Sequence, residues 1–536
     1  MHSTMTAKIR QERDTSFAKN VMMLAVAQIV VKVLGLIYKI IIVNIPGFGD
    51  TGNGYYSAGY QLYMVLLAIS SIGIPNVVSK MVSERVAVGD YRGAHRVFSV
   101  IFRMFSLIGF LLASGLYLFA DSISVALFGA KGVSYTLKAL SPAVLFVSSN
   151  AVLRGYFTGL GSLKSTSISE IIEQTFNCLL SVLFVYMVVG KDTAIMAAAG
   201  NLSTSVAAFV SVGYMLSHYL LRRRYLLSEA MLQKVPGESV KTLPLIKTVL
   251  GFAIPAAFAS LVSTLSSNID SITVNQYTGN VEAYGVLSKT ETLTHLPLSL
   301  SATLFVAIVP VISAMIKTED YRGARDKLSN TLFLSLVIIL PCAMGFIVLA
   351  DPILKLLYPA VSDGAVLLQL QTVAMIFAAI TFVFNGVFYG LGQQKHAAVI
   401  LLLGSALKLL LNLLFLDKFK MGVTGAAVAT IIYQILVTAV EGIVLNRYVK
   451  VRLKFLKQFL KPMIATGIMG ALVFLIYKVL IRHAGNTVST LLAILGGVVV
   501  YFITLLALGT LSHEDYLQLP MGEKIYRLLK KLHLAR

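Results

Sequence analysis

Long apolar segments recur along almost the whole chain, and this feature most restricts how it can fold. Many of them reach the roughly 20 residues that an α-helix needs to cross a bilayer. Only 13% of the 536 residues are charged, whereas roughly a quarter are charged in soluble globular proteins. Helices are the structures that such segments form in lipid, because a helix satisfies its own backbone hydrogen bonds. The sequence therefore predicts an all-α polytopic membrane protein.

Fourteen segments are long and apolar enough to be predicted as membrane spans. The first begins near residue 20 and carries charges within it, so it is not typical of a cleavable signal peptide. Proline occurs within or near the ends of several spans, where neighbouring helices in a bundle satisfy the freed backbone groups. The predicted spans are 17–44, 57–82, 97–120, 136–160, 167–189, 194–218, 248–277, 284–315, 328–350, 364–391, 396–416, 421–446, 459–479 and 487–511.

Lysine and arginine are distributed unevenly between alternate connecting segments. With the N-terminus inside, the inner segments hold 31 of these residues, the outer loops hold 8, and 6 lie in spans. Cytoplasmic loops carry the excess of positive charge, so the pattern predicts a cell-membrane protein with both termini in the cytoplasm. It also accounts for the net charge of +21 without a nucleic-acid partner. We expect the basic loops to contact anionic lipid headgroups.

The two halves of the chain share motifs in the same order, which indicates an internal duplication. Each copy contains six predicted spans, an even number, so both copies have the same orientation in the membrane. Transporters with such parallel repeats bind substrate between the two halves. The matched segments are 90-DYRGAHR-96 with 320-DYRGARD-326, 155-GYFTGLGSLK-164 with 386-GVFYGLGQQK-395, 77-VVSK-80 with 311-VISA-314, and 52-GNGYY-56 with 279-GNVEAY-284.

The repeat predicts two six-helix lobes around a central cavity, followed by two further helices. Cys178 and Cys342 both lie in apolar spans and do not suggest a disulfide framework. The predicted divisions are an N-lobe at 1–225, a basic cytoplasmic linker at 226–247, a C-lobe at 248–447, and spans 13 and 14 with a basic cytoplasmic tail at 448–536.

Three of these segments carry a family resemblance, namely 31-VKVLGLIYKI-40, 75-PNVVSKMVSERVAVGDYRGA-94 and 155-GYFTGLGSLKSTSISEIIEQTFN-177. The chain resembles the polysaccharide-transporter branch of the multidrug/oligosaccharidyl-lipid/polysaccharide (MOP) exporter superfamily. It is most like stage V sporulation protein B and the Gram-positive lipid II flippases of the MurJ type. The resemblance implies alternating-access transport of an undecaprenyl-linked sugar. Lipid II is the first choice, and a teichoic-acid, capsule or spore-related precursor is the alternative.

Four basic residues in spans are candidates for binding the pyrophosphate of such a substrate. Lys32 and Lys39 are seven residues apart and share one helix face about 10 Å long. A charge at bilayer depth is costly, so it should face a cavity or a partner. Arg154 would hold phosphate with two hydrogen bonds, and Lys289 lies in the polar start of span 8. The alternatives are snorkelling or carboxylate pairing for the lysines and a cytoplasmic anchor beside Lys164 for Arg154.

Carboxylates in spans are candidates for coupling or gating. Glu170 and Glu173 lie three residues apart in span 5, so they share a helix face. Two close carboxylates raise one another's pKa and can carry a proton. The alternative is a structural pairing of these carboxylates with Arg154 or Lys164. Glu291, in the polar start of span 8, belongs to the same class of candidates.

Asp270 in span 7 and Lys408 in span 11 form a second charged group. Some MurJ-type relatives are thought to hold sodium between these helices, and Asp270 resembles one ligand. Span 11 here supplies Lys408 where another oxygen ligand would be wanted. This departure argues against sodium, so we predict neither a metal site nor a cofactor. The Lys408 ammonium would instead occupy the cation's place and pair with Asp270, and Glu441 is another possible partner.

Two competing classes fit the sequence less well. An enzyme is disfavoured because the chain has no GxxxxGK[ST] loop and no HExxH motif. A multidrug or cation antiporter of the same superfamily would favour acidic residues in its cavity, whereas six basic residues lie in the spans. We therefore expect a transporter that acts as a monomer on an anionic lipid-linked substrate.

The predicted Asp270–Lys408 pair is tested by removing its members separately and together. Deleting one partner of a buried pair typically costs about 3–5 kcal/mol, because the other charge is left uncompensated. Asp270→Ala and Lys408→Ala should each lower the thermal stability of the purified protein. The double variant should be less destabilised than the sum of the two single variants. Strictly additive losses would contradict the pair.

Overall fold

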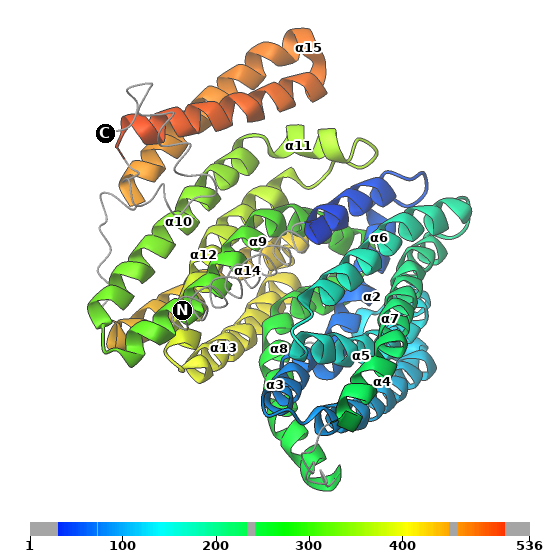
Figure 1. Ribbon diagram of the computed structural model, residues 1–536. Coiled ribbons are helices and arrows are strands. Elements are labelled where there is room, and N and C mark those ends of the chain that lie inside the picture. The colour runs from blue at the N-terminus through cyan, green and yellow to red at the C-terminus, as the bar shows by residue number, and fades with distance from the viewer. Residues whose placement is uncertain (1–29, 72, 233–241, 450–458, 510–536) are drawn as a thin grey trace. The chain divides into compact units, whose positions relative to one another are not determined.

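The computed structural model describes residues 30–71, 73–232, 242–449 and 459–509, and almost all of them are helical (Figure 1). No β-strand occurs within these ranges. The fold is therefore all-α, as the apolar segments predict. The start of the first predicted span, residues 233–241 of the predicted linker at 226–247 and the basic C-terminal tail lie outside the described residues.

The chain divides into two structural units, which cover residues 1–285 and 286–536. In the first unit, α8 packs against α2, α3 and α4. The predicted divisions place residues 242–247 of this helix in the linker and the rest in the C-lobe, and they stay predictions. The helices of the first unit are the first helix (30–43), α2 (Gly49–Ser70), α3 (Ile74–Ala87), α4 (Tyr91–Phe128), α5 (Val133–Gly159), α6 (Leu163–Met187), α7 (Thr193–Leu232) and α8 (Thr242–Thr278).

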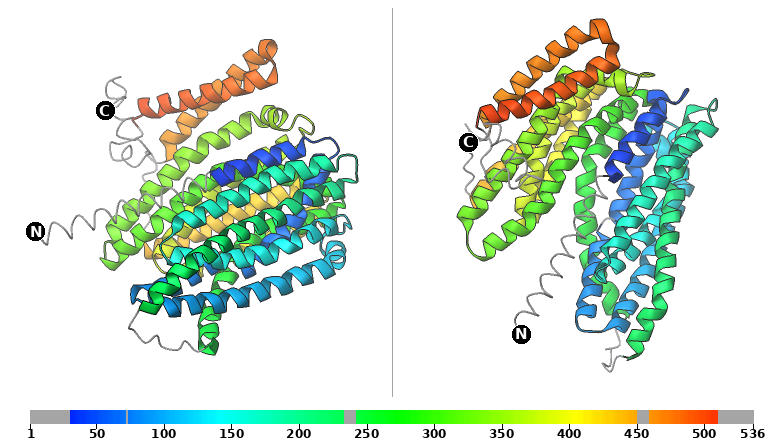
Figure 2. Two further views of the ribbon diagram at one scale, coloured as in Figure 1. Left: turned by 45° about the vertical axis from the view of Figure 1, so that its right-hand side comes forward. Right: turned by 45° about the horizontal axis from the view of Figure 1, so that its top comes forward.

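The second unit contains most of α9 and all later helices. Its last helix, α15, bends at Gly485, whose backbone has φ 68° and ψ 172°, and Figure 2 shows the two arms. The helices are α9 (Val281–Lys317), α10 (Tyr321–Val348), α11 (Ala350–Leu357), α12 (Ala365–Gly390), α13 (Gln394–Asn412), the π-helix η1 (Leu413–Lys418), α14 (Val423–Tyr448) and α15 (Lys461–Ala507).

Twelve helical segments within the described ranges are long and apolar enough to cross a membrane. One of them, α15, has 47 residues and contains most of the predicted spans at 459–479 and 487–511. The first predicted span begins outside the described residues. The multi-pass helical fold is confirmed, while the count of fourteen spans stays a prediction.

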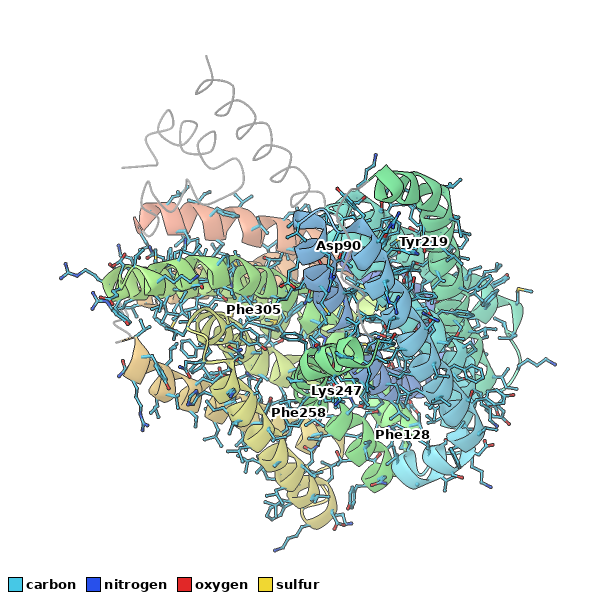
Figure 3. The ribbon with its side chains drawn as sticks, turned by 60° about the horizontal axis from the view of Figure 1, so that its bottom comes forward. Asp90, Phe128, Tyr219, Lys247, Phe258 and Phe305 are labelled. Atoms are coloured by element: carbon cyan, nitrogen blue, oxygen red, sulfur yellow. The ribbon has the colours of Figure 1, made fainter. Side chains whose placement is uncertain are left out.

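The first repeated motif forms the same helix cap in both units. Asp90 and Asp320 precede α4 and α10, and their backbones have φ, ψ of −84°, 70° and −82°, 69°. Each carboxylate accepts a hydrogen bond of 2.8 Å from the backbone N–H of Gly93 or Gly323, which satisfies one free donor of the first turn. Figure 3 shows Asp90 at the same end of the first unit as Tyr219 of α7.

The second repeated motif forms the same turn between two helices. Gly161, after α5, has φ +81°, and Gly392, after α12, has φ +70°. These left-handed conformations favour glycine because it has no Cβ. In each turn the following backbone N–H donates a 2.8 Å bond to a phenylalanine carbonyl, from Ser162 to Phe157 and from Gln393 to Phe388.

Glycines in the same motif allow two helices to approach closely. A Cβ on Gly155 of α5 would lie 2.8 Å from the Pro75 carbonyl oxygen and from Val78 of α3, and a Cβ on Gly386 of α12 would lie 2.5 Å from Ile308 of α9. Small residues at such contacts are typical of packed membrane helices. The two units therefore repeat the same helix pair.

These contacts correct one of the sequence matches. Val78 and Ile308 meet equivalent glycines, so the offset in this helix is 230 residues. The proposed match of 77-VVSK-80 with 311-VISA-314 has an offset of 234 and is wrong by about one helical turn. An apolar helix presents similar residues four positions apart on the same face, which explains why the displaced match looked convincing.

Replacing Gly155 by alanine tests the close packing of α3 and α5. Gly155→Ala should lower the stability by roughly 1–3 kcal/mol, because the added methyl group meets backbone that cannot move aside freely. Gly213→Ala in α7 is the control, since a Cβ there meets no atom within 4 Å. It should be neutral or stabilising by up to about 1 kcal/mol. Equal thermal unfolding temperatures for both variants would contradict the packing argument.

Candidate functional site

The two lysines of the first helix have different surroundings. Lys39 is half-buried, and its ammonium lies 5.9 Å from the centre of the Tyr56 ring in α2. The Tyr56 ring is itself fully buried, and its hydroxyl is 3.1 Å from that of Tyr38. A cation over an aromatic ring is attracted by the negative face of the ring. The protein therefore already holds the Lys39 charge through its own aromatic residues.

Lys32 is exposed and has no ion pair or hydrogen bond to any described residue. It lies eleven residues before Val43, where the first helix ends, which is a distance of about 16 Å along the axis. The hydrocarbon core of a bilayer is about 30 Å thick. Lys32 therefore lies well inside the span and remains available to a partner outside the described structure.

Arg154 of α5 pairs with Glu173 of α6. The guanidinium Nη2 lies 2.7 Å from the carboxylate Oε2, and the two side chains are 18% and 26% exposed. Partial burial makes such a pair stronger than one on the surface, because the charges are less screened. Two predicted site residues are thus brought together, in the arrangement that the sequence offered as a structural pair.

Hydroxyl and amide groups extend this ion pair across three helices. Arg154 also donates to the Ser169 hydroxyl at 3.2 Å. Asn150 donates to the Glu173 carboxylate at 3.3 Å and to the Ser211 hydroxyl of α7 at 2.8 Å. Ser169 and Ser211 are linked at 2.8 Å. The network joins α5, α6 and α7 and orients both charged groups.

The network belongs to a longer row of polar side chains along α6, here called the polar seam. This row was not predicted from the sequence. Asn177, one turn beyond Glu173, accepts a 2.6 Å hydrogen bond from Ser203 of α7. Ser181, a further turn along, is 2.6 Å from the same Ser203 hydroxyl. The signal was present in the sequence as a polar residue at every fourth position, which places all of them on one helix face. The seam residues of α6 are Ser165, Ser169, Glu173, Asn177 and Ser181.

The second predicted carboxylate of α6 is not part of the described ion pair. Glu170 is half-buried and lies one turn before Glu173. Glu291 of α9 is also half-buried. Their predicted coupling roles stay predictions.

Lys289 is buried within the second unit, with only 1% of the residue exposed. Its ammonium donates a 2.6 Å hydrogen bond to the Val361 carbonyl and lies 5.4 Å from the centre of the Tyr358 ring. Both partners belong to the connection between α11 and α12. Lys289 therefore fixes this connection in the present structure, and a substrate would have to displace these contacts to reach it.

Asp270 and Lys408 are both buried, with exposures of 2% and 1%. Asp270 lies in α8 of the first unit, and Lys408 lies in α13 of the second unit, 5.7 Å from the centre of the Tyr433 ring. Their pairing stays a prediction. A lysine ammonium donates hydrogen bonds and offers no ligand oxygen, so Lys408 itself cannot serve as a sodium ligand.

Comparisons with known proteins place these features in a family. A family model described as "Polysaccharide biosynthesis protein" matches residues 17–316, and one described as "Lipid II flippase MurJ" matches residues 225–496. The Lipid II flippase MurJ of Bacillus subtilis is 25% identical, over 84% of this chain and 86% of its own length. Stage V sporulation protein B of the same organism is 21% identical, over 96% and 99%.

Solved structures show the same fold. The structure titled "Lipid II flippase MurJ, inward closed conformation" has a TM-score of 0.67 at 20% identity, and covers 90% of this chain and 98% of its own. An inward-facing MATE multidrug transporter of the MOP superfamily has a TM-score of 0.68 at 14% identity, over 80% and 98%. The similar scores do not separate the two classes of substrate.

The repeated helical lobes define a membrane transporter of the flippase type, not an enzyme. The chain belongs to the polysaccharide-transporter branch of the MOP exporter superfamily, together with proteins of the MurJ and stage V sporulation protein B type.

A double-mutant cycle tests the strength of the Arg154–Glu173 pair. We expect Arg154→Gln and Glu173→Gln each to reduce stability, and the coupling energy to be about 1–3 kcal/mol because the pair is largely buried and networked. The control is the pair of Asp351 and Lys355 in α11, which has the same 2.7 Å separation but side chains 51% and 52% exposed. Its coupling should be about 0–1 kcal/mol. Equally weak coupling in both pairs would contradict a stabilising network around Arg154.

Proposed function

We propose that this protein flips lipid II, the undecaprenyl-pyrophosphate-linked peptidoglycan precursor, from the inner to the outer leaflet by alternating access. The match to the MurJ family model over residues 225–496 and the B. subtilis flippase at 25% identity support this substrate. The proposal includes a monomer with both termini in the cytoplasm and basic loops against anionic lipids. Under it, an ion gradient or the membrane potential drives the transport step, or the substrate moves down its own concentration gradient.

The observation that carries the proposal is the unpaired Lys32 on the first helix. An ammonium group facing hydrocarbon costs at least about 2.5 kcal/mol. Lys32 is exposed and unpaired within the described structure, so an aqueous cavity or an anionic ligand is the environment that stabilises it. A pyrophosphate supplies the complementary charge. An organic cation, the typical substrate of a multidrug antiporter, would be repelled.

The other basic residues would bind the pyrophosphate after Lys32, one after another, as the substrate moves. Lys39 lies on the same face of the first helix, seven residues and about 10 Å from Lys32. Lys39 is half-buried, with its ammonium near the Tyr56 ring. Arg154 is held by Glu173 in this structure. We propose that phosphate competes with the Glu173 carboxylate for Arg154, so that substrate binding changes this ion pair. Lys289 would take part only after its contact with Val361 is broken.

The carboxylates are proposed to couple this exchange to the conformational cycle. Glu173 would be released when Arg154 engages phosphate, and Glu170 lies one turn away to share a proton or a cation. In the C-terminal half, Glu291 and the proposed pair of Asp270 with Lys408 would respond to the same movement. None of these steps requires a bound metal.

A second candidate substrate is another lipid-linked glycan, such as a spore-related, teichoic-acid or capsule precursor. The similarity to stage V sporulation protein B, which covers 96% of this chain, favours this alternative. Both candidates contain a phosphate-linked undecaprenyl carrier and would use the same cations. They differ in the sugar, which the charged residues do not distinguish.

Complementation of bacteria depleted of their lipid II flippase tests the proposal. The wild-type protein should restore growth and cell shape. Lys32→Ala should lower the transport rate about tenfold or more, because a hydrogen bond to a charged group contributes about 1.5–3 kcal/mol. Lys32→Arg, which keeps the charge, should retain most activity. Lys131→Ala removes an exposed charge between α4 and α5 and should have no effect.

Protein amounts in the membrane must be equal for the comparison. Failure of a correctly inserted wild-type protein to restore growth would contradict lipid II as the substrate and favour the other lipid-linked glycans. Full activity of Lys32→Ala would contradict the role of the first-helix charge.

A further inference from the structure

Glu441 of α14 is a buried carboxylate that the proposed transport mechanism does not use. Its residue exposure is 0%, and neither carboxylate oxygen has a hydrogen-bond partner within the described structure. No ion pair involving Glu441 occurs there either. A charged group in this position is very unfavourable, because an ionised carboxylate removed from water requires a cation or several donors.

The nearest polar groups belong to α12 and do not satisfy this carboxylate. Thr381 and Asn385 face Glu441, but neither reaches hydrogen-bond geometry with it. The Thr381 hydroxyl is instead 2.9 Å from the Thr438 hydroxyl and accepts a 3.1 Å bond from Gln434. The amide oxygen of Asn385 is also buried without a partner. Thr381 and Asn385 carry donor hydrogens as well as oxygens, but within the described structure none of them is in hydrogen-bond geometry with the carboxylate.

The internal repeat shows that this arrangement is specific to the second unit. At offsets of 230 or 231 residues, Asn150, Arg154 and Ser211 of the first unit correspond to Thr381, Asn385 and Glu441. The first unit balances its acid, Glu173, with Arg154 at 2.7 Å. The second unit has an amide in place of that arginine, and its acid lies on a different helix. The second unit therefore has an acid without the cation that balances the acid of the first unit.

The position equivalent to Glu173 is Gly404 of α13. A Cβ on Gly404 would lie 2.5 Å from Val437 of α14. The helices α13 and α14 are therefore too close at this point to hold a second ion pair like that of the first unit. This packing encloses the side of α14 on which Val437 and Glu441 lie one turn apart.

No other charge on the adjacent helices compensates Glu441 within the described residues. Within the described residues α14 packs mainly against α12, α13 and η1, and its Leu445 shares an apolar cluster with residues of α9 and α10. Lys408 of α13 lies against Tyr433, eight residues before Glu441 on α14, which is about 12 Å along the axis. His396 lies against Tyr448 at the far end, with ring centres 5.8 Å apart. The ionisable side chains on α12, α13, η1 and α14 are Tyr389 of α12, Lys395, His396 and Lys408 of α13, Asp417 and Lys418 of η1, and Tyr433, Arg447 and Tyr448 of α14 itself.

We propose that Glu441 is a proton-binding site inside the second unit, and that Asn385 accepts the hydrogen bond of the protonated carboxyl group. Protonation forms one O–H bond on a carboxylate oxygen and removes its negative charge. A carboxylate only accepts hydrogen bonds, whereas the neutral acid also donates one. A single proton therefore removes the buried charge and provides a donor for the orphan oxygen of Asn385.

The site also couples proton binding to movement of the helices. The ionised form is stable only when water or a cation reaches the carboxylate, which requires α12, α13 and α14 to separate. Release of the proton therefore favours an open arrangement, and its uptake favours the packed one described here. If the protein is the flippase proposed above, a proton gradient would supply energy to the cycle through Glu441. This last step rests on the proposed function, whereas proton binding itself does not.

Infrared titration of the purified full-length protein tests proton binding without any substrate. The wild-type protein should show the carbonyl band of a protonated carboxyl group in an apolar environment, and the band should persist at neutral pH. Glu441→Gln, which imitates the neutral acid, should lose this band and keep its thermal stability. Glu282→Gln, which changes an exposed carboxylate, should keep the band. Asn385→Ala should shift the band because the acceptor is lost.

Absence of the band from the wild-type protein, or its persistence in Glu441→Gln, would overturn the proposal. Stabilisation of the wild-type protein by sodium but not by potassium, lost in Glu441→Gln, would identify a cation site instead. In lipid vesicles containing lipid II, an imposed proton gradient should change the translocation rate of the wild type and of Glu282→Gln but not of Glu441→Gln. An equal response of Glu441→Gln would show that the proton is not coupled to transport.

Discussion

The hydrocarbon interior of a membrane does not solvate charge, so each ionisable side chain in a span must be compensated by another part of the protein or by a ligand. This constraint explains most of the charged positions described here. The Arg154 guanidinium is held by Glu173, the Lys289 ammonium by the Val361 carbonyl, and the Lys39 ammonium by an aromatic ring. Among the basic residues discussed here, Lys32 is the one for which no compensating group occurs in the described part of the chain. This is the basis of the proposal that Lys32 binds the substrate.

Close helix packing makes this compensation possible. Gly155 and Gly386 allow the equivalent helices of each unit to approach to backbone contact, and the hydroxyl groups along α6 reach across to α7. Because the first and second units repeat the same caps and glycine contacts, differences between them are informative. The first unit contains the Arg154–Glu173 ion pair. The second unit has Asn385 in place of the arginine and Gly404 in place of the glutamate, and its buried acid, Glu441, lies on a different helix. Duplication has preserved the helical framework, and the two units have diverged in their charged groups.

The sequence alone predicts the helical membrane fold, the duplication and the transporter class, because hydropathy, repeated caps and loop charge are local properties. It also identifies Arg154 and Glu173 as possible partners. The burial of Lys289 could not be predicted, because it depends on a connection about 70 residues away along the chain. The seam along α6 was missed although its period of four residues is visible, since serine is common in membrane helices and composition does not reveal a partner. The correct alignment of the α3 sequence with the α9 sequence in the internal repeat could be established only from the glycine contacts within each unit.

The proposed function depends on an anionic lipid-linked substrate, and direct transport in a purified system tests this most clearly. Fluorescent lipid II in vesicles containing only this protein should move between leaflets faster than in protein-free vesicles, and unlabelled lipid II should compete with it. A cationic dye should not be transported. Export of the dye together with no movement of lipid II or of other undecaprenyl-linked glycans would contradict the account, because the first helix would then serve a substrate of the opposite charge.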